Sequence, residues 1–205
     1  MPMPIKGVYI DTGEKGYEVE TCYYLRFQIK AVRICIERLK IKKDDIDSTT
    51  WDDICDYYHY YCDHLVFSLG QISNRFRLNE NKNRDYNSRI EENRRNFNFD
   101  NSVYPIISAK DVRNLVEHID EYNIATVEKV RGVGGFNVIF DDMKDEIKDR
   151  IQNSENEHPY NYDAVNHEIV VYKSKTRWVV SLEELSREIS NLEEYVVSFQ
   201  TLLTS

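Results

Sequence analysis

The strongest constraint on the fold is a long run of apolar residues at helical spacing between Trp51 and Leu78. Successive members of this run are three or four residues apart, which places their side chains on one face of an α-helix. Ser, Thr and Thr at 48–50 supply capping hydroxyls, and two aspartates follow in the predicted first turn. The sequence therefore predicts a long helix over 51–78. Its apolar face comprises Trp51, Ile54, Cys55, Tyr58, Tyr61, Cys62, Leu65, Leu69, Ile72 and Phe76.

Three further segments have the pattern of amphipathic helices. Apolar positions recur at helical spacing over residues 18–40, and again over 109–122 with Ser108 as the predicted N-cap. Ser-Leu-Glu-Glu at 181–184 is a capping box, so the last helix is predicted to begin there. Residues 79–101, rich in Asn, Arg and Glu, fit either a polar helical extension or a loop. Four amphipathic helices of this length favour a bundle.

A stretch with strand character precedes the last predicted helix. Three short runs there are rich in β-branched and aromatic residues, and the last two are joined by a short polar turn. The predicted strands are residues 136–140, 168–172 and 176–180. We therefore predict a mainly α fold: a helical bundle of about four long helices with a small β-hairpin or sheet inserted before the last helix. The chain is read as a single domain, 1–205, with 1–17 as an N-terminal arm and 132–180 as the β-containing insertion.

The composition of the chain indicates its surroundings. Hydrophobic residues make up 41% of the 205 and charged residues 31%, the balance of a folded globular domain. No apolar run approaches the roughly 20 residues of a membrane span, and the first residues lack the apolar core of a secretory signal. None of the four cysteines forms a Cys-x-x-Cys pair. We predict a cytoplasmic protein with reduced core thiols, no membrane partner and no cofactor.

The charge of the chain is negative overall but unevenly distributed. A formal charge of −9 argues against broad adhesion to nucleic acid, since phosphate contacts rely on Lys and Arg. Between residues 75 and 95, however, seven basic residues stand against four acidic ones. Two interpretations stay open for this segment: a solvated charged helix, or a basic surface that follows an RNA backbone. The predicted RNA-binding residues are Arg84, Arg89, Arg94 and Arg95.

The hexapeptide at 113–118, Arg-Asn-Leu-Val-Glu-His, has the most chemical content in the chain. At about 100° per residue, Arg113, Asn114 and His118 fall on the half of the predicted helix opposite its apolar face. Asn114 and His118 are four residues apart and so are neighbours on that surface. These three polar side chains are therefore predicted to face solvent, a groove or a partner subunit.

This set of side chains suits the cleavage of RNA without a metal. The reaction needs the 2′-hydroxyl deprotonated, the charge on the phosphorane stabilised and the leaving oxygen protonated. Histidine suits the proton steps because its pKa lies near neutrality, and arginine suits the phosphate because its planar fork donates twice. One histidine serves poorly as both acid and base, whereas two copies across a symmetric dimer supply both roles.

Arg113-Asn114-x-x-x-His118 resembles the Arg-x4-6-His motif of HEPN domains, in which a polar residue often follows the arginine. HEPN proteins are helical bundles that include metal-independent ribonucleases of toxin–antitoxin, abortive-infection and CRISPR-linked systems. The resemblance implies that Arg113 contacts the scissile phosphate, that His118 transfers protons and that Asn114 assists. It also implies a homodimer with the catalytic groove between protomers, an RNA substrate, and an antitoxin protein or a phage-defence setting.

Simpler interpretations of the same residues remain. Arg113 and Glu117 suit a surface ion pair worth under about 1 kcal/mol, with His118 solvated beside them. The chain would then be a non-catalytic helical protein for dimerisation or partner binding. Ligand-type side chains elsewhere favour a structural interpretation: the set Cys55, His59, Cys62 and His64 fits a core stripe better than a zinc site, and the carboxylates at 141–146 fit a solvated acidic face.

Overall fold

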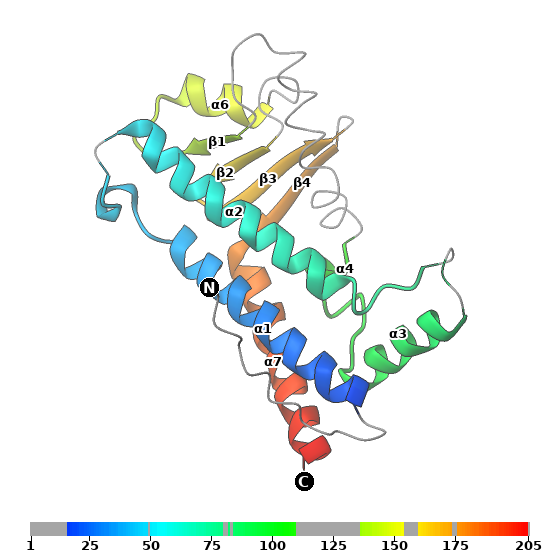
Figure 1. The fold of residues 1–205 in the computed structure, drawn as a ribbon. Coiled ribbons are helices and arrows are strands. Elements are labelled where there is room, and N and C mark those ends of the chain that lie inside the picture. The colour runs from blue at the N-terminus through cyan, green and yellow to red at the C-terminus, as the bar shows by residue number, and fades with distance from the viewer. Residues whose placement is uncertain are drawn as a thin grey trace, which may run out of the picture.

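The computed structural model describes residues 16–48, 50–79, 82, 84–109, 136–153, 160–173 and 176–204. These residues form a mostly helical protein with a small four-stranded sheet before the last helix, as predicted (Figure 1). The elements are α1 (Gly16–Leu39), η2 (Lys43–Asp45), α2 (Trp51–Ser73), α3 (Arg84–Asn96), α4 (Pro105–Ser108), β1 (Phe136–Ile139), α6 (Asp145–Asn153), β2 (Tyr160–Asp163), β3 (Glu168–Lys173), β4 (Thr176–Ser181) and α7 (Leu182–Thr204).

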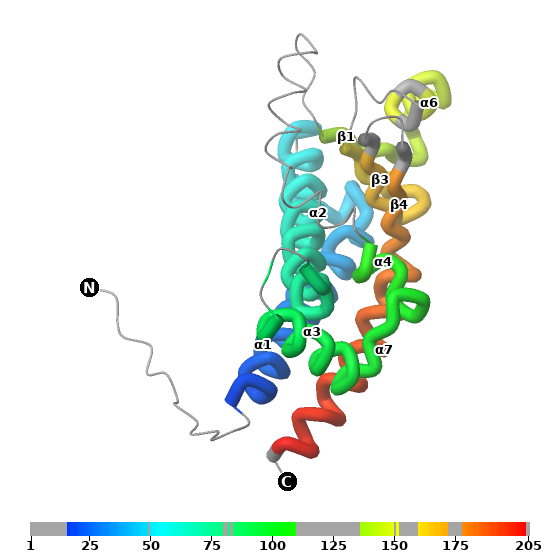
Figure 2. The backbone as a smooth tube through the Cα atoms, turned by 90° about the vertical axis from the view of Figure 1, so that its right-hand side faces the viewer, coloured from blue at the N-terminus to red at the C-terminus, as the bar shows by residue number. Residues whose placement is uncertain are grey.

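The three longest described helices, α1, α2 and α7, pack side by side and enclose the main core (Figures 1 and 2). The hydroxyl of Tyr24 donates to Gln71 Oε1 at 2.5 Å, and that of Tyr57 donates to the Arg38 carbonyl at 3.2 Å, so α1 and α2 run antiparallel. On the other side of α1, Arg33 forms an ion pair with Glu193 of α7 at 2.6 Å. The fully enclosed side chains of these helices include Leu25, Ile29, Val32, Leu39, Cys62, Leu65, Leu69, Ile72, Leu185, Ile189, Leu192 and Val196.

The sequence predicts where the helices start better than where they end. Thr50 caps α2, since its Oγ1 accepts the Asp53 N–H at 3.2 Å, and Ser181 Oγ accepts from Glu184 at the start of α7. α2 ends at Ser73, before the predicted end at residue 78, and residues 74–76 form a turn. α1 starts at Gly16, inside the predicted arm, whose residues 1–15 lie outside the described part of the chain. Among the described helices, none combines the length and apolar character that crossing a bilayer requires.

The sheet has the strand order β1-β2-β3-β4. β1 and β2 are parallel, with α6 in the connection between them, whereas the other two pairs are antiparallel. The predicted strands at 136–140, 168–172 and 176–180 are confirmed as β1, β3 and β4. β2 was missed because all of its residues, Tyr160–Asp163, are buried, and the alternation that marks a half-exposed strand is absent.

The first half of α2 covers one face of the sheet (Figure 1). Tyr162 of β2 stacks on Tyr58 with ring centroids 5.3 Å apart, and its hydroxyl donates to the Leu39 carbonyl at 2.7 Å. The Tyr58 hydroxyl in turn donates to the Ile41 carbonyl at 2.6 Å. These two tyrosines therefore satisfy the carbonyls at the end of α1 and join sheet, α1 and α2 into one core.

A second aromatic cluster lies at the other end of α2, away from the sheet. Phe99 is sandwiched there, stacked on Phe76 at 4.0 Å and on Tyr104 at 4.7 Å. Phe97, just after α3, packs edge-on against Phe76 and against Phe199 of α7. Residues 79–101, for which the sequence left helix and loop open, therefore contain a helix, α3, whose end is fixed by this cluster.

Candidate functional site

The predicted catalytic residues Arg113, Asn114 and His118 lie outside the described residues. The structure describes the chain on either side of them, up to Ala109 after α4 and again from Phe136 at the start of β1. The structure does describe the contacts that hold α4 and β1, the two elements that flank this segment. It also describes the predicted RNA-binding arginines and the other polar groups.

The end that precedes the segment is anchored by a buried carboxylate on α7. Glu188 accepts the backbone N–H of Ile106 through Oε1 at 2.9 Å and that of Ile107 through Oε2 at 3.0 Å. Glu188 is 7% exposed, and burial raises the pKa of its carboxyl, while the two backbone hydrogen bonds act in the opposite direction. One side chain thus satisfies two of the N–H groups that the first turn of α4 leaves without a helical partner.

The predicted N-cap at Ser108 is wrong. Ser108 is the last residue of α4, and Ala109 has φ −57° and ψ 125°, which is not helical backbone. The N–H of Ala109 closes the turn on the Ile106 carbonyl at 3.2 Å. A helix that carries the hexapeptide therefore does not begin at Ala109; the rest of the predicted range, 110–122, lies outside the described residues.

The end that follows the segment is held by an aromatic stack. The ring of His59 on α2 lies flat against that of Phe136, with centroids 4.4 Å apart, and Tyr160 packs edge-on against both. β1 therefore sits beside the first half of α2, whereas α4 lies beside the far end of that helix (Figures 1 and 2). The segment that carries the motif starts and ends at opposite ends of α2.

The four predicted RNA-binding arginines all lie on α3, but their surroundings differ. Arg94 is half-buried and donates to the Phe76 carbonyl and to Asn101 Oδ1, each at 2.9 Å. Its guanidinium also lies 5.6 Å from the centre of the Phe99 ring. Arg94 therefore braces the connection between α2, α3 and α4 through two of its five N–H donors.

The other three arginines are exposed. The guanidinium of Arg89 lies over the ring of Tyr17 at 5.0 Å, a cation–π contact with the start of α1. Arg84 and Arg95 are separated by three helical turns and fall within about 20° of each other on the helix surface. These two share a solvent-facing side of α3 opposite the buried Ile90 and Asn93.

Of the cysteines and histidines of α2, Cys62 is buried, Cys55 and His59 are partly buried and His64 is exposed. Burial is the main cause that raises the pKa of the Cys55 thiol to about 11 and the pKa of Cys62 well above its usual range. Both thiols are therefore protonated near neutral pH. Within the described residues, no three or more His, Cys, Asp or Glu side chains gather in a way that suits a metal ion.

Sequence reasoning missed one polar cluster, which lies between α2 and the sheet. His59 Nε2 is 3.3 Å from Asp63 Oδ2 one helical turn away, and the buried Tyr160 side chain lies beside Asp63 and Cys62. Burial first, and then these two neighbours, raise the pKa of Tyr160 well above its usual range. The spacing of His59 and Asp63 was visible in the sequence, but nothing local showed that β2 brings a tyrosine to them.

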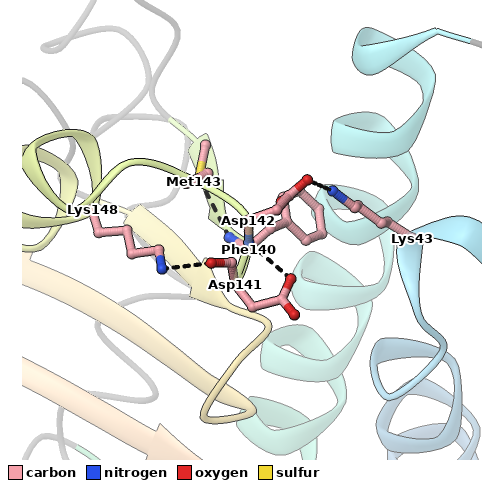
Figure 3. A network of polar contacts seen from close by, with 6 residues as sticks. All are labelled: Lys43, Phe140, Asp141, Asp142, Met143 and Lys148. Atoms are coloured by element: carbon pink, nitrogen blue, oxygen red, sulfur yellow. Dashed lines mark hydrogen bonds and ion pairs between the residues drawn. The ribbon is translucent and has the colours of Figure 1, made fainter.

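Two lysines contact the acidic turn at residues 141–142, just after β1 (Figure 3). Lys43 forms an ion pair with Asp142 and lowers the pKa of that carboxyl, and Lys148 donates to the Asp141 carbonyl at 2.8 Å. The Phe140 N–H points to Met143 Sδ at 3.4 Å and closes the turn. The turn joins β1, α6 and η2, which is a structural role for the carboxylates at 141–142.

Two open hollows flank α7. One, of about 410 Å³, lies beside Lys40, and the other, of about 340 Å³, lies beside the loop that leads into α4. Arg187 and Asn191 form the ridge between them and contribute to both. The anchoring residue Glu188 lines the second hollow, so this surface adjoins the entry to the segment that carries the motif.

Comparison with known proteins adds no relative: no family model, curated protein or solved structure matches the chain.

Proposed function

We propose that the protein is a metal-independent endoribonuclease of HEPN type, which cleaves RNA in a groove between two protomers. The observation that carries the proposal is the Arg113-Asn114-x3-His118 motif in a mostly helical protein. The described frame supports it, because both ends of the segment that holds the motif are fixed to the core, by Glu188 at one end and by His59 at the other. Chemistry on such a segment benefits from a rigid support.

Each residue of the motif has a chemical role in this proposal. Arg113 holds the scissile phosphate and balances the negative charge that grows on the phosphorane. His118 takes the proton of the 2′-hydroxyl in one protomer, and the partner's imidazole protonates the leaving 5′-oxygen. Asn114, four residues before His118, orients the imidazole or donates to a phosphate oxygen. The products are an RNA ending in a 2′,3′-cyclic phosphate and one beginning with a 5′-hydroxyl.

The arginines of α3 divide into two groups under this proposal. Arg84, Arg89 and Arg95 are exposed and supply positive charge to an RNA backbone. Arg94, which donates one hydrogen bond each to Phe76 and Asn101, contributes by keeping α3 in place. A role in a toxin–antitoxin or phage-defence system, with an antitoxin protein as partner, extends the proposal and rests on the family resemblance alone.

The test is cleavage of a labelled RNA by the full chain in excess EDTA. We expect cleavage to persist in EDTA and to leave cyclic-phosphate ends. Arg113→Ala and His118→Ala are each expected to slow it by at least about a hundredfold, the usual size of a lost acid–base or electrostatic contribution. Loss of activity in EDTA, or equal activity of the His118→Ala variant, would refute the proposal.

A matched control is Arg26→Ala on α1, which also removes an exposed arginine, one that donates to Gln200, twelve residues after Glu188 on α7. It is expected to cleave at the parent rate. All variants are purified in parallel with the parent protein, so that a contaminating ribonuclease would appear equally in each preparation.

A second candidate function is a non-catalytic protein for dimerisation or partner binding. The observation that favours it is a set of exposed aromatic side chains on α1 and α2, including Phe27 and Phe67. Contiguous exposed apolar side chains of this kind mark association surfaces. This function predicts no RNA cleavage, and association that is unchanged in the Arg113→Ala and His118→Ala variants.

A further inference from the structure

The outward surface of α1 and α2 carries large apolar side chains that remain in contact with water. Phe27 is 69% exposed and Phe67 is 53% exposed, although the opposite sides of both helices form the core. Three more side chains on these two helices are exposed by about half: Tyr23, Ile34 and Tyr60. We call these five residues the α1/α2 face. Single exposed apolar residues are ordinary, whereas a contiguous group marks an association surface.

The helical period shows that these residues are contiguous. At about 100° per residue, Tyr23, Phe27 and Ile34 fall within about 40° of one another on α1, and Tyr60 and Phe67 within about 20° on α2. α1 and α2 lie side by side and antiparallel (Figure 1), in the register that the contacts of Tyr24 with Gln71 and of Tyr57 with Arg38 fix. In this register Phe27 lies level with Phe67, and Ile34 lies level with Tyr60.

The extent of the face suits one bound helix. Tyr23 and Ile34 are about 16 Å apart along the axis of α1, which a helix of about 12 to 18 residues covers. With about 200 Å² for a fully exposed large side chain, the five residues present roughly 500 Å² of apolar surface. A standard interface buries about 800 Å² on each partner, of which a little over half is apolar. The α1/α2 face is therefore as large as the apolar part of such an interface.

The charges that α1 contributes to the face balance. Glu20 and Glu37 are exposed on its outward side, beside the exposed Lys30 and Arg38. All four fall within about 60° of the centre of the face on the helix surface. Two further exposed arginines of α1 turn toward α7 instead and contact it there, Arg26 and Arg33. α1 therefore adds no net charge to the face.

The start of α2 and the turn before it are acidic. α2 contains no lysine or arginine, whereas three exposed aspartates stand in its first two turns. The turn that leads into α2 adds three more exposed aspartates against one exposed lysine, Lys42. The six aspartates are Asp44, Asp45, Asp47, Asp52, Asp53 and Asp56. The α1/α2 face is therefore apolar in the middle and acidic at the end where α1 leads into α2.

We propose that the α1/α2 face binds an amphipathic helix of another protein, whose apolar side meets the five side chains and whose lysines or arginines meet the aspartates. Charge complementarity selects this occupant. RNA and an anionic membrane have the same sign as the acidic end and are repelled by it. A second copy would bring the same surplus of aspartates. The inference rests on the second candidate function, partner binding, and does not depend on ribonuclease activity.

The probe for this test is a synthetic peptide of about 18 residues, with leucines at helical spacing on one side and lysines on the other. An acidic counterpart has glutamate at every lysine, and a scrambled version has the same composition without the apolar stripe. Fluorescence anisotropy of each labelled peptide is measured against the full chain, with no RNA present. We expect a Kd of about 10 μM or tighter for the basic peptide, and at least about 30-fold weaker binding of the other two.

Substitutions at the centre of the face locate the binding. Phe27→Ser and Phe67→Ser are each expected to weaken binding of the basic peptide at least about tenfold, because each removes a central apolar contact. Leu202→Ser on α7 is the matched control, since Leu202 is 70% exposed and lies outside the α1/α2 face. It is expected to bind within about twofold of the parent. All three side chains are exposed, so the circular dichroism spectra should match that of the parent.

Asp56→Lys tests the acidic end. It is expected to weaken binding of the basic peptide about fivefold at low salt, and the effect should fade at high salt. Glu194→Lys on α7 makes the same change in net charge at an exposed position outside the face, and should bind the peptide as the parent does. Because the whole chain has a formal charge of −9, this control separates the face from a general attraction between peptide and protein.

Failure of the basic peptide to bind at about 100 μM overturns the proposal, as does equal binding of the acidic peptide. Unchanged binding by both Phe27→Ser and Phe67→Ser overturns it as well. Sedimentation equilibrium examines the other occupant: a parent dimer that Phe67→Ser converts to monomers means that a second copy covers the face, and the proposal is then wrong. RNA cleavage in EDTA is measured separately, so that failure of the ribonuclease proposal and failure of this one are distinguishable.

Discussion

Glu188 on α7 accepts a hydrogen bond from the backbone N–H of Ile106, 82 residues earlier in the chain, at 2.9 Å. Its second carboxylate oxygen takes the next N–H, so that a single buried side chain fixes the start of α4. The segment with the proposed catalytic residues begins just beyond this point. Glu188 thus fixes the last described turn of the chain before that segment, and it is also a core residue.

Replacing Glu188 by glutamine should destabilise the protein. The amide keeps one acceptor oxygen but places a donor against the second backbone N–H, and an unsatisfied buried polar group costs about 1–3 kcal/mol. Urea unfolding followed by circular dichroism measures the change. Glu194→Gln, at an exposed position on the same helix, serves as the control and should stay within about 0.5 kcal/mol of the parent.

The same pair of proteins should differ in how stability depends on pH. Burial raises the pKa of Glu188 in the folded protein, so the folded state binds its proton more tightly than the unfolded state does. The contribution of this carboxyl is therefore fully present below its unfolded pKa and declines as the pH rises through the raised folded value. The free energy of unfolding of the parent, minus that of Glu188→Gln, should fall as the pH rises from about 4 upward. A difference that rises over this range would contradict the assignment.

Two buried tyrosine hydroxyls should respond oppositely to removal. The Tyr162 hydroxyl donates to the Leu39 carbonyl at 2.7 Å, so Tyr162→Phe leaves that carbonyl unsatisfied and should cost about 1–3 kcal/mol. Among the described residues, none hydrogen-bonds the buried Tyr104 hydroxyl, so Tyr104→Phe should be neutral or stabilising. Thermal unfolding of the two variants compares them directly, and an equal loss in both would show that ring packing rather than hydrogen bonding decides the outcome.

The cysteines should resist alkylation while the protein is folded. The pKa of the Cys55 thiol is raised to about 11, mainly by burial, so at pH 8 only about a thousandth of it is thiolate. Cys62 lies deeper still, with no exposed surface. A thiol reagent at pH 8 should therefore react with the native protein at least about a hundredfold more slowly than with the protein in guanidinium. Rapid labelling of the native state would show that α2 opens readily.

Arg94 and Arg95 are adjacent in the sequence but should differ in effect. Arg94→Ala removes donors from the Phe76 carbonyl and from Asn101, and should cost about 1–3 kcal/mol of stability. Arg95→Ala should leave stability within about 0.5 kcal/mol, because the side chain is exposed. RNA binding is compared between His118→Ala and the double variant His118→Ala/Arg95→Ala. The double variant should bind RNA more weakly, and the slope of its log affinity against log salt concentration should decrease by about one phosphate contact. Unchanged binding would place the RNA elsewhere.

Sequence periodicity predicted burial more reliably than it predicted the ends of helices. Phe76 continues the apolar spacing of α2 and is buried, yet α2 ends at Ser73. The turn at 74–76 brings Phe76 onto Phe99. Phe76 is therefore buried by a tertiary contact, although it lies after the end of the helix whose apolar spacing it continues. Local signals with a direct partner, such as Thr50 with Asp53 or Ser181 with Glu184, were predicted correctly.

The features that sequence reasoning missed depend on distant partners. β2 has no alternation because both of its faces are covered, and Glu188 resembles any surface glutamate of an amphipathic helix. Only the fold brings Ile106 to Glu188 and Tyr160 to Asp63. The proposed catalytic residues themselves remain a prediction from the sequence, with the ends of their segment as the part that the structure describes.

The pairing of α1 with α7 also bears on how the chain is made. Arg26 and Arg33 near the start of the chain reach Gln200 and Glu193, and the enclosed leucines of α7 complete the core that α1 begins. During synthesis, the part of the α1 surface that packs on α7 stays uncovered until residues 182–204 have left the ribosome. A nascent chain halted before residue 182 therefore exposes apolar surface of the kind that chaperones recognise.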